Sequence, residues 1–339
     1  DGTSVLAFIG GKRSIVRSQT RLALNFSKSL LGWVVVLSYL IGLEYWLGWD
    51  VLLQPILGLN RELFVAALLL LTFSQLIRAM RLHDLLRDRV ADAKPSFGLV
   101  FSISAVHNAA NHLLPSRAGE FSLPLLLRQH LSITLSGGSG GLVWLRLMDL
   151  QVLLLLGCVG ASMRSALPEN ENGIGLVVFF GLASLCGILM VLLVSRRNRI
   201  KNWLGNQSIT LAQLLHYVPS TPINVSRQIA WTSLNWIIKF VTLAYLLIAF
   251  LSSAGNPMVT LGFAITAILG GELSAISPLH APGGFGSYAT GVVLFAQGGN
   301  IPVVELASAA ISLHLVLFGT SQLVGALGWI FLRRVKRRR

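Results

Sequence analysis

Charged and helix-breaking residues lie close together at positions 107–120, within an otherwise apolar region. Positions 107–120 read His-Asn-Ala-Ala-Asn-His-Leu-Leu-Pro-Ser-Arg-Ala-Gly-Glu. The guanidinium of Arg117 is a planar fork of donors that suits a phosphate or a carboxylate. Glu120 either exchanges protons or caps the helix that follows. Charges at membrane depth persist where they are buried in protein or line a wet cavity, so this stretch predicts a site for an anionic group.

A second stretch repeats this theme late in the chain. Positions 277–286 read Ser-Pro-Leu-His-Ala-Pro-Gly-Gly-Phe-Gly. Gly283, Gly284 and Gly286 allow an unwound backbone whose N–H groups face an anion, or else close packing of two helices. His280 either carries protons near neutral pH or is only hydrogen-bonded. We expect the two stretches to face each other and to form one site.

Further polar residues lie inside apolar segments. Arg146 and Asp149 are three apart on a predicted helix, so they either pair only with each other or take part in the site. Lys239 either contacts substrate or extends toward the membrane surface. Each such charge costs roughly 2.5–3.5 kcal/mol at the bilayer centre, so we expect pairing or contact with water. The predicted substrate-binding set is Asn111, Arg117, Glu120, Arg128, Arg146, Asp149, Lys239, His280, Gly283, Gly284, Gly286 and His314.

The composition predicts an all-α polytopic membrane protein. Of the 339 residues, 54% are hydrophobic and only 12% are charged, more apolar surface than a soluble domain can bury. The net charge of +14 lies in short segments between apolar runs, a membrane topology pattern that argues against nucleic acid as a partner. The sequence shows no nucleotide-binding loop, no three-ligand metal pattern and no nucleophile–histidine–acid arrangement. We therefore expect no cofactor, no metal and no catalytic residue.

The hydropathy pattern predicts about six full spans and two longer, interrupted stretches. The spans are expected near 29–47, 62–80, 139–161, 175–194, 229–251 and 302–332. The interrupted stretches are 97–135 and 259–297, each too long for one span and broken by Pro and Gly. The basic residues from Arg78 to Lys94 alternate with leucines and predict an amphipathic helix on the membrane surface.

The distribution of Lys and Arg predicts how these elements cross the membrane. The basic segments 1–28, 78–94, 195–202 and 333–339 should all be cytoplasmic, with both termini among them. The stretch 97–135 must then enter and leave from the cytoplasm, and 259–297 from outside. Both are predicted to be re-entrant hairpins. The halves 29–161 and 175–332 then form an inverted-topology repeat, which is the plan of many secondary transporters.

Four ordered motifs carry a resemblance to a known family. They are Leu-Pro-Ser-Arg-Ala-Gly-Glu at 114–120, Pro-Leu-Leu-Leu-Arg at 124–128, Leu-Arg-Leu-Met-Asp at 145–149 and Ala-Pro-Gly-Gly-Phe-Gly at 281–286. Together they resemble the membrane region of lysyl-phosphatidylglycerol synthases and their stand-alone, flippase-like relatives. The resemblance covers nearly the whole chain. It implies movement of lipid between leaflets, and we expect this chain, with its basic tail, to lack the separate aminoacyl-transferring domain.

The chain departs from the family pattern at four positions. Leu123 and His314 stand where the family has arginine, and Leu145 and Ala289 stand where it has glutamate. These changes leave the scaffold intact. They leave open the identity of the headgroup and any coupling to protons.

Together these features predict a flippase-like lipid transporter of a bacterial-type inner membrane. Arg117, Arg128 and Arg146 would hold the anionic headgroup of a phospholipid or a polyprenyl phosphate, while Glu120 and Asp149 balance their charge. Two alternatives stay open. One is an intramembrane enzyme acting on a lipid phosphate or a polyprenyl-linked sugar. The other is a non-catalytic partner of a lipid-modifying or glycan-assembly enzyme; a partner enzyme or a homo-oligomer is compatible with the sequence.

Overall fold

The chain divides into two units, and its functional features lie in the second. A computed structural model describes residues 38, 41–42, 44–45, 48–87, 95–165, 174–219, 221–255, 259–275, 282–296 and 301–337. The units are residues 1–50 and 51–339. The predicted basic N-terminal segment 1–28 and most of the span 29–47 lie outside the described residues.

The described residues form helices and contain no β-strand. Five helices are long and apolar enough to cross a membrane: α3 (Arg61–Arg87), α6 (Leu135–Ser165), α7 (Ile174–Ser195), α10 (Pro222–Ser253) and α13 (Val303–Arg337). They confirm the five predicted spans after 29–47 and extend each of them. The shorter helices are α2 (Trp49–Leu57), α4 (Phe97–Leu113), α5 (Ser122–Leu131), α8 (Arg197–Gln207), α9 (Ile209–Leu214), α11 (Leu261–Ser274) and α12 (Phe285–Phe295).

Each interrupted stretch contains two short helices and a short 3₁₀ turn among its described residues. The turn η1 (Pro115–Phe121) separates α4 from α5, and it begins at a proline, which lacks the N–H that would continue α4. The turn η2 (Pro282–Gly284) precedes α12, with Gly283 and Gly284 at φ 71° and 74°, a conformation that glycine adopts without strain.

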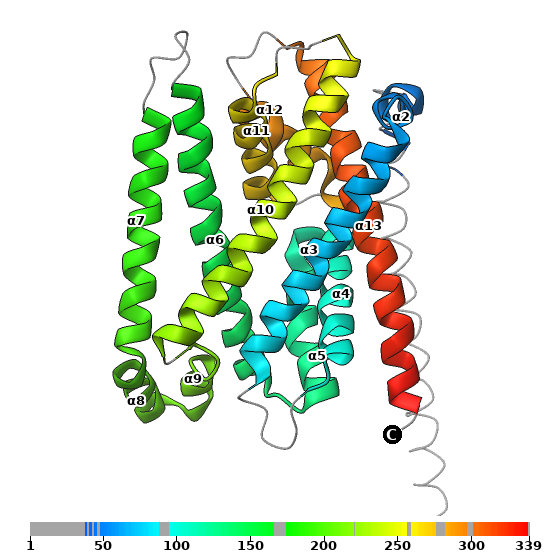
Figure 1. Cartoon of the computed structure of the whole chain (residues 1–339). Helices are drawn as coiled ribbons and strands as arrows, with labels where there is room; N and C mark the ends of the chain where they lie inside the picture. Colours follow the sequence, from blue (N-terminus) through cyan, green and yellow to red (C-terminus); the bar gives the residue numbers. More distant parts are fainter. Residues whose placement is uncertain are drawn as a thin grey trace, which may run out of the picture. The chain divides into compact units, whose positions relative to one another are not determined.

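The two short-helix pairs lie toward opposite ends of the second unit, and their turns meet. Figure 1 shows α4 and α5 in the lower half and α11 and α12 in the upper half. The turn η1 contacts η2, and α4 also contacts η2. The expectation that the two stretches face each other is therefore confirmed for the described residues. That both pairs are re-entrant, and that the halves are inverted repeats, stay predictions.

One sequence-based interpretation is wrong. Arg78 to Arg87 do not form a separate surface helix, because α3 continues unbroken to Arg87. Positions 88–94 of the predicted helix lie outside the described residues. Arg81 is 3% exposed and pairs with an acid on another helix. Positions 78 and 81 are three apart and share one face of α3. That face turns inward, so these two cations belong to the interior.

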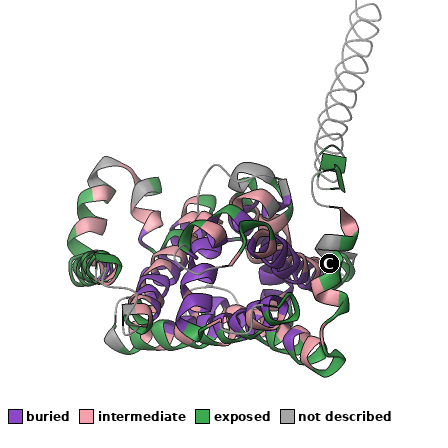
Figure 2. Cartoon of the chain, turned by 90° about the horizontal axis from the view of Figure 1, so that it is seen from above, coloured by how far each residue is buried: buried purple, intermediate pink, exposed green. Residues whose placement is uncertain are grey.

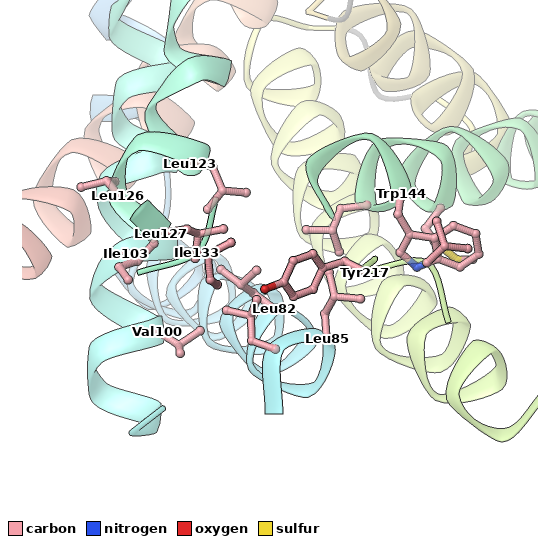
Figure 3. Packing of buried hydrophobic residues seen from close by; sticks show 14 of the residues in the cluster. Leu82, Leu85, Val100, Ile103, Leu123, Leu126, Leu127, Ile133, Trp144 and Tyr217 are labelled. Carbon is pink, nitrogen blue, oxygen red and sulfur yellow. The ribbon is translucent and has the colours of Figure 1, made fainter. Parts of the chain in front are cut away.

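A hydrophobic cluster packs α3, α4, α5 and α6 together. Figure 3 shows leucines of α3, Val100 and Ile103 of α4, leucines of α5 and Trp144 of α6, with the ring of Tyr217 among them. Figure 2 shows that buried residues gather on helix sides turned toward the middle of the unit. Apolar packing against α3 and α6 therefore holds α4 and α5, the two helices on either side of the turn η1.

The helix α7 presents apolar side chains to its surroundings along its length. Val177, Phe180, Ile188 and Val191 are among its exposed residues, and it packs mainly on α6. Such a surface is unfavourable in water and matches lipid tails. Its exposure fits a membrane-embedded helix.

Close packing of α11 on α12 depends on two facing glycines. A Cβ atom added to Gly270 would lie 2.1 Å from the carbonyl oxygen of Gly291, and one added to Gly291 would lie 2.3 Å from that of Gly270. Real Cβ atoms do not approach so closely, so a side chain at either position must push the helices apart. This contact sets how closely α11 approaches α12, the helix that follows η2.

We predict that Gly270→Ala destabilises the protein by about 1–3 kcal/mol, because it overpacks the α11–α12 contact. Gly319→Ala on α13 is the matched control, since a Cβ there meets no atom within 4 Å. Thermal unfolding in detergent should show a lower midpoint for Gly270→Ala only. Equal midpoints for the two variants would contradict the packing role.

Candidate functional site

A cavity of about 400 Å³ lies inside the second unit. It is bounded by α3, α4, η1, α6, α10, α11, α12 and α13, so both short-helix pairs and the long helices contribute. The polar lining residues of the first half are Arg78, Asn108, Asn111, His112, Glu120, Arg146 and Asp149. Those of the second half are Trp236, Lys239, Glu272, Tyr288 and His314.

Asp149 connects three helices at the wall of this cavity. It is 2% exposed. Its Oδ1 lies 2.5 Å from Nη1 of Arg81 on α3 and accepts a hydrogen bond of 2.9 Å from Nε1 of Trp236 on α10. Its Oδ2 lies 3.3 Å from Nη1 of Arg146, three residues back on α6. A buried carboxylate needs several such partners to offset its lost hydration.

Arg146 also reaches across to the turn η1. Its Nη2 and Nε donate to Oε1 and Oε2 of Glu120 at 2.6 and 3.2 Å, which is a two-point contact. Asn111 on α4 donates to the same Oε1 at 3.4 Å. The predicted local pairing of Arg146 with Asp149 is confirmed, but it is one link of a longer chain of charges. The fork of Arg146 fixes η1 against α6.

The second half supplies a separate ion pair. Nζ of Lys239 on α10 lies 2.7 Å from the carboxylate of Glu272 on α11, and also 4.9 Å from the ring centre of Trp236. Lys239 therefore points inward rather than toward a membrane surface. This pair joins the second short-helix pair to α10, as Arg146 and Glu120 join the first to α6.

The histidine on α13 holds the turn η2. Nε2 of His314 lies 2.7 Å from the carbonyl oxygen of Gly283. Its ring stacks beside that of Tyr288 at 4.7 Å and lies 6.0 Å from that of His112 on α4. The loop carbonyl is thus turned toward His314. Gly283 serves the site through its backbone, as an acceptor.

Six of the predicted site residues line the cavity: Asn111, Glu120, Arg146, Asp149, Lys239 and His314. Gly284 and Gly286 shape η2 and the start of α12 without lining it. The backbone of Arg117 lies in η1, but its side chain lies outside the described part of the chain, as does the whole of His280.

Arg128 is corrected by the structure. Its side chain is exposed on α5 and does not line the cavity. The helix α5 buries Leu123, Leu126 and Leu127. The face that carries position 128 is consequently turned outward, and we remove Arg128 from the headgroup site.

The predicted site left out seven participants. They are Arg78, Arg81, Asn108, His112, Trp236, Glu272 and Tyr288. Arg78 and Arg81 could have been predicted from the sequence, because two cations on one face of an apolar helix normally face the protein interior or a water-filled cavity. Glu272 stood out as an acid in an apolar segment but had no visible partner, since Lys239 is 33 residues away in sequence.

Comparison with known families identifies the family of this chain. The family model described as "Lysylphosphatidylglycerol synthase TM region" matches residues 29–325. The chain belongs to this family. The comparisons with curated proteins and with solved structures each found no match. Membership confirms the resemblance inferred from the four motifs. With the five long apolar helices, it makes the chain an integral membrane protein.

Loss of the negative charge at Asp149 should destabilise this family member strongly. We predict that Asp149→Asn lowers the free energy of unfolding by about 3–5 kcal/mol, because Arg81 is left buried without a counter-charge. Glu120→Gln is the comparison, and it should lower that free energy by about 1 kcal/mol or less. Arg146 is partly exposed, and in this variant it retains its ion pair with Asp149. Thermal unfolding in detergent measures both. A larger effect at Glu120 would contradict the central role of Asp149.

Proposed function

We propose that this chain transports a lipid with an anionic, phosphate-containing headgroup between membrane leaflets. The observation that carries the proposal concerns Val143 on α6. This residue lines the charged cavity and is also 58% exposed. At Val143 the cavity wall and the outer surface of the bundle coincide. A lipid could place its headgroup among the charges there and keep its tails outside.

The wall formed by α6 supports this division of the ligand. Leu142, Val143, Leu147 and Leu150 line the cavity beside Arg146 and Asp149. The remaining polar lining comes from α3, α4, η1, α10, α11, α12 and α13. Apolar and charged groups on one helix suit a molecule that is itself apolar at one end and charged at the other.

Transport would proceed by alternating access. We propose that the α4–α5 pair enters the membrane from the cytoplasm and the α11–α12 pair from outside, with the halves 29–161 and 175–332 as inverted repeats. Rocking of the halves would open the cavity to each leaflet in turn. The lipid headgroup would bind in the cavity beside the ion pair of Arg146 and Glu120. We place the protein in a bacterial-type inner membrane with both termini cytoplasmic.

This proposal assigns no chemical step to the chain. A transporter releases its lipid unchanged, whereas an intramembrane enzyme acting on a lipid phosphate would form a product. Purified protein in detergent, incubated with phospholipid and analysed by mass spectrometry, separates the two. We expect no new lipid species, and a product that depends on the protein would overturn the proposal in favour of an enzyme.

Blocking the cavity mouth should stop transport without touching a buried charge. We predict that Val143→Trp lowers the rate of lipid movement at least about tenfold in proteoliposomes that contain a fluorescent anionic phospholipid, since the larger ring fills the point where the headgroup enters. Rates are read from the fraction of lipid accessible to dithionite. The tenfold figure corresponds to about 1.4 kcal/mol in the barrier.

The matched control for this experiment lies on the same helix. Val159 is 49% exposed and does not line the cavity. Val159→Trp should therefore transport at the wild-type rate. Equal rates for both variants, in folded protein at equal density, would contradict entry of the lipid through this cavity.

A further inference from the structure

The charges around the cavity do not balance. Among the described side chains at and directly behind its wall, Arg81 pairs with Asp149, Arg146 with Glu120, and Lys239 with Glu272. Each of the three carboxylates therefore has its own cation. Arg78 is a fourth cation, and it lines the same cavity. The described part of the site thus carries one positive charge in excess.

Arg78 has a partner, but not a counter-charge. Its Nη1 donates to Oδ1 of Asn108 at 2.6 Å, and it forms no ion pair within the part of the chain that the structure describes. The amide of Asn108 is neutral. It is held in place by its own Nδ2, which donates to Oγ of Ser321 on α13 at 2.8 Å. Asn108 therefore orients the guanidinium of Arg78 without neutralising it.

Apart from the bond to Asn108, the donors of Arg78 have no hydrogen-bond partner among the described residues, and the side chain borders open space. A guanidinium has five N–H donors, and Asn108 accepts from one nitrogen. Arg78 lines the main cavity and also two adjoining spaces of about 20 Å³ each. By contrast, Arg146 directs all three of its nitrogens to Glu120 and Asp149. Of these two arginines, Arg78 has the donors to spare.

Two neutral groups on the same cavity wall also lack partners. Oδ1 of Asn111 and the hydroxyl of Tyr288 are buried, and neither has a hydrogen-bond partner among the described residues. Buried polar atoms are normally satisfied, so an unpaired pair of them beside a cavity indicates a polar ligand. An apolar molecule would leave both unsatisfied and would leave Arg78 without a counter-charge.

We propose that Arg78 binds the negatively charged group of the ligand, and that this group is a phosphate with one net negative charge. This inference rests on the proposed lipid transport and assigns the headgroup charge to a particular residue. The phosphate would complete the balance that the three carboxylates leave open. It would approach Arg78 from the main cavity, where Asn108 also lines the wall and orients the guanidinium.

Isothermal titration calorimetry of the purified full chain in detergent tests this assignment. The probes are dihexanoyl phosphatidylglycerol with one negative charge, dihexanoyl phosphatidylcholine with none, and inorganic phosphate. The variants are Arg78→Gln, which removes the charge, and Arg78→Lys, which keeps it. Arg128→Gln is the matched control, because Arg128 is exposed and does not line the cavity. Thermal unfolding checks that each variant is folded.

We expect the wild type to bind the anionic lipid more tightly than the zwitterionic one. Arg78→Gln should weaken binding of the anionic lipid at least about tenfold, the loss typical of one charge-assisted contact. Arg78→Lys should retain most of the affinity, and Arg128→Gln should bind as the wild type does. Binding by folded Arg78→Gln at the wild-type affinity, or equal affinity of the wild type for the two lipids, would overturn the proposal.

Two further outcomes separate this inference from the transport proposal. One is that inorganic phosphate binds as tightly as the lipid and with the same dependence on Arg78. That result would support an anion-binding site at Arg78 and would overturn the claim that its ligand is a lipid. If the wild type moves lipid in proteoliposomes and Arg78→Gln both binds and moves it normally, transport stands and the assignment of Arg78 fails.

Discussion

The buried carboxylate of Asp149 is the interaction on which the rest of the site depends. It joins α3, α6 and α10 through Arg81, Arg146 and Trp236. An apolar surrounding strengthens such contacts and raises the cost of losing one of them. Asp149 also holds Arg146 in the position from which Arg146 contacts Glu120 in the turn η1. The position of η1 at the cavity therefore depends on the buried charge of Asp149 on α6.

The charges are arranged as pairs between elements, which explains how so many can exist inside an apolar bundle. Lys239 and Glu272 connect α10 to α11, as Arg146 and Glu120 connect α6 to η1. Each pair ties a short helix or turn to a long helix. Both short-helix pairs are thereby fixed at their inner ends, where the turns η1 and η2 meet. The two ion pairs therefore set the positions of both turns at the cavity.

Much of the fold was predictable from the sequence, and the reasons are local. Five spans followed from apolar length, and the breaks at Pro115 and at Gly283 followed from backbone chemistry. Interior contacts between distant segments were not predictable, because no pattern links Arg81 to Asp149 across 68 positions. Arg128 was misassigned for the same reason, since its charge was visible but the outward face of α5 was not.

The central claim is that the charged cavity holds a phosphate-bearing lipid. Native mass spectrometry of the protein released from mild detergent, with identification of the retained lipid, tests it most directly. Leu147→Trp supplies the comparison, because Leu147 lines the cavity without carrying charge. We predict that the wild type retains a single phosphate-bearing lipid and that folded Leu147→Trp loses it. Retention of the same mixed bulk lipid by both proteins would contradict the claim.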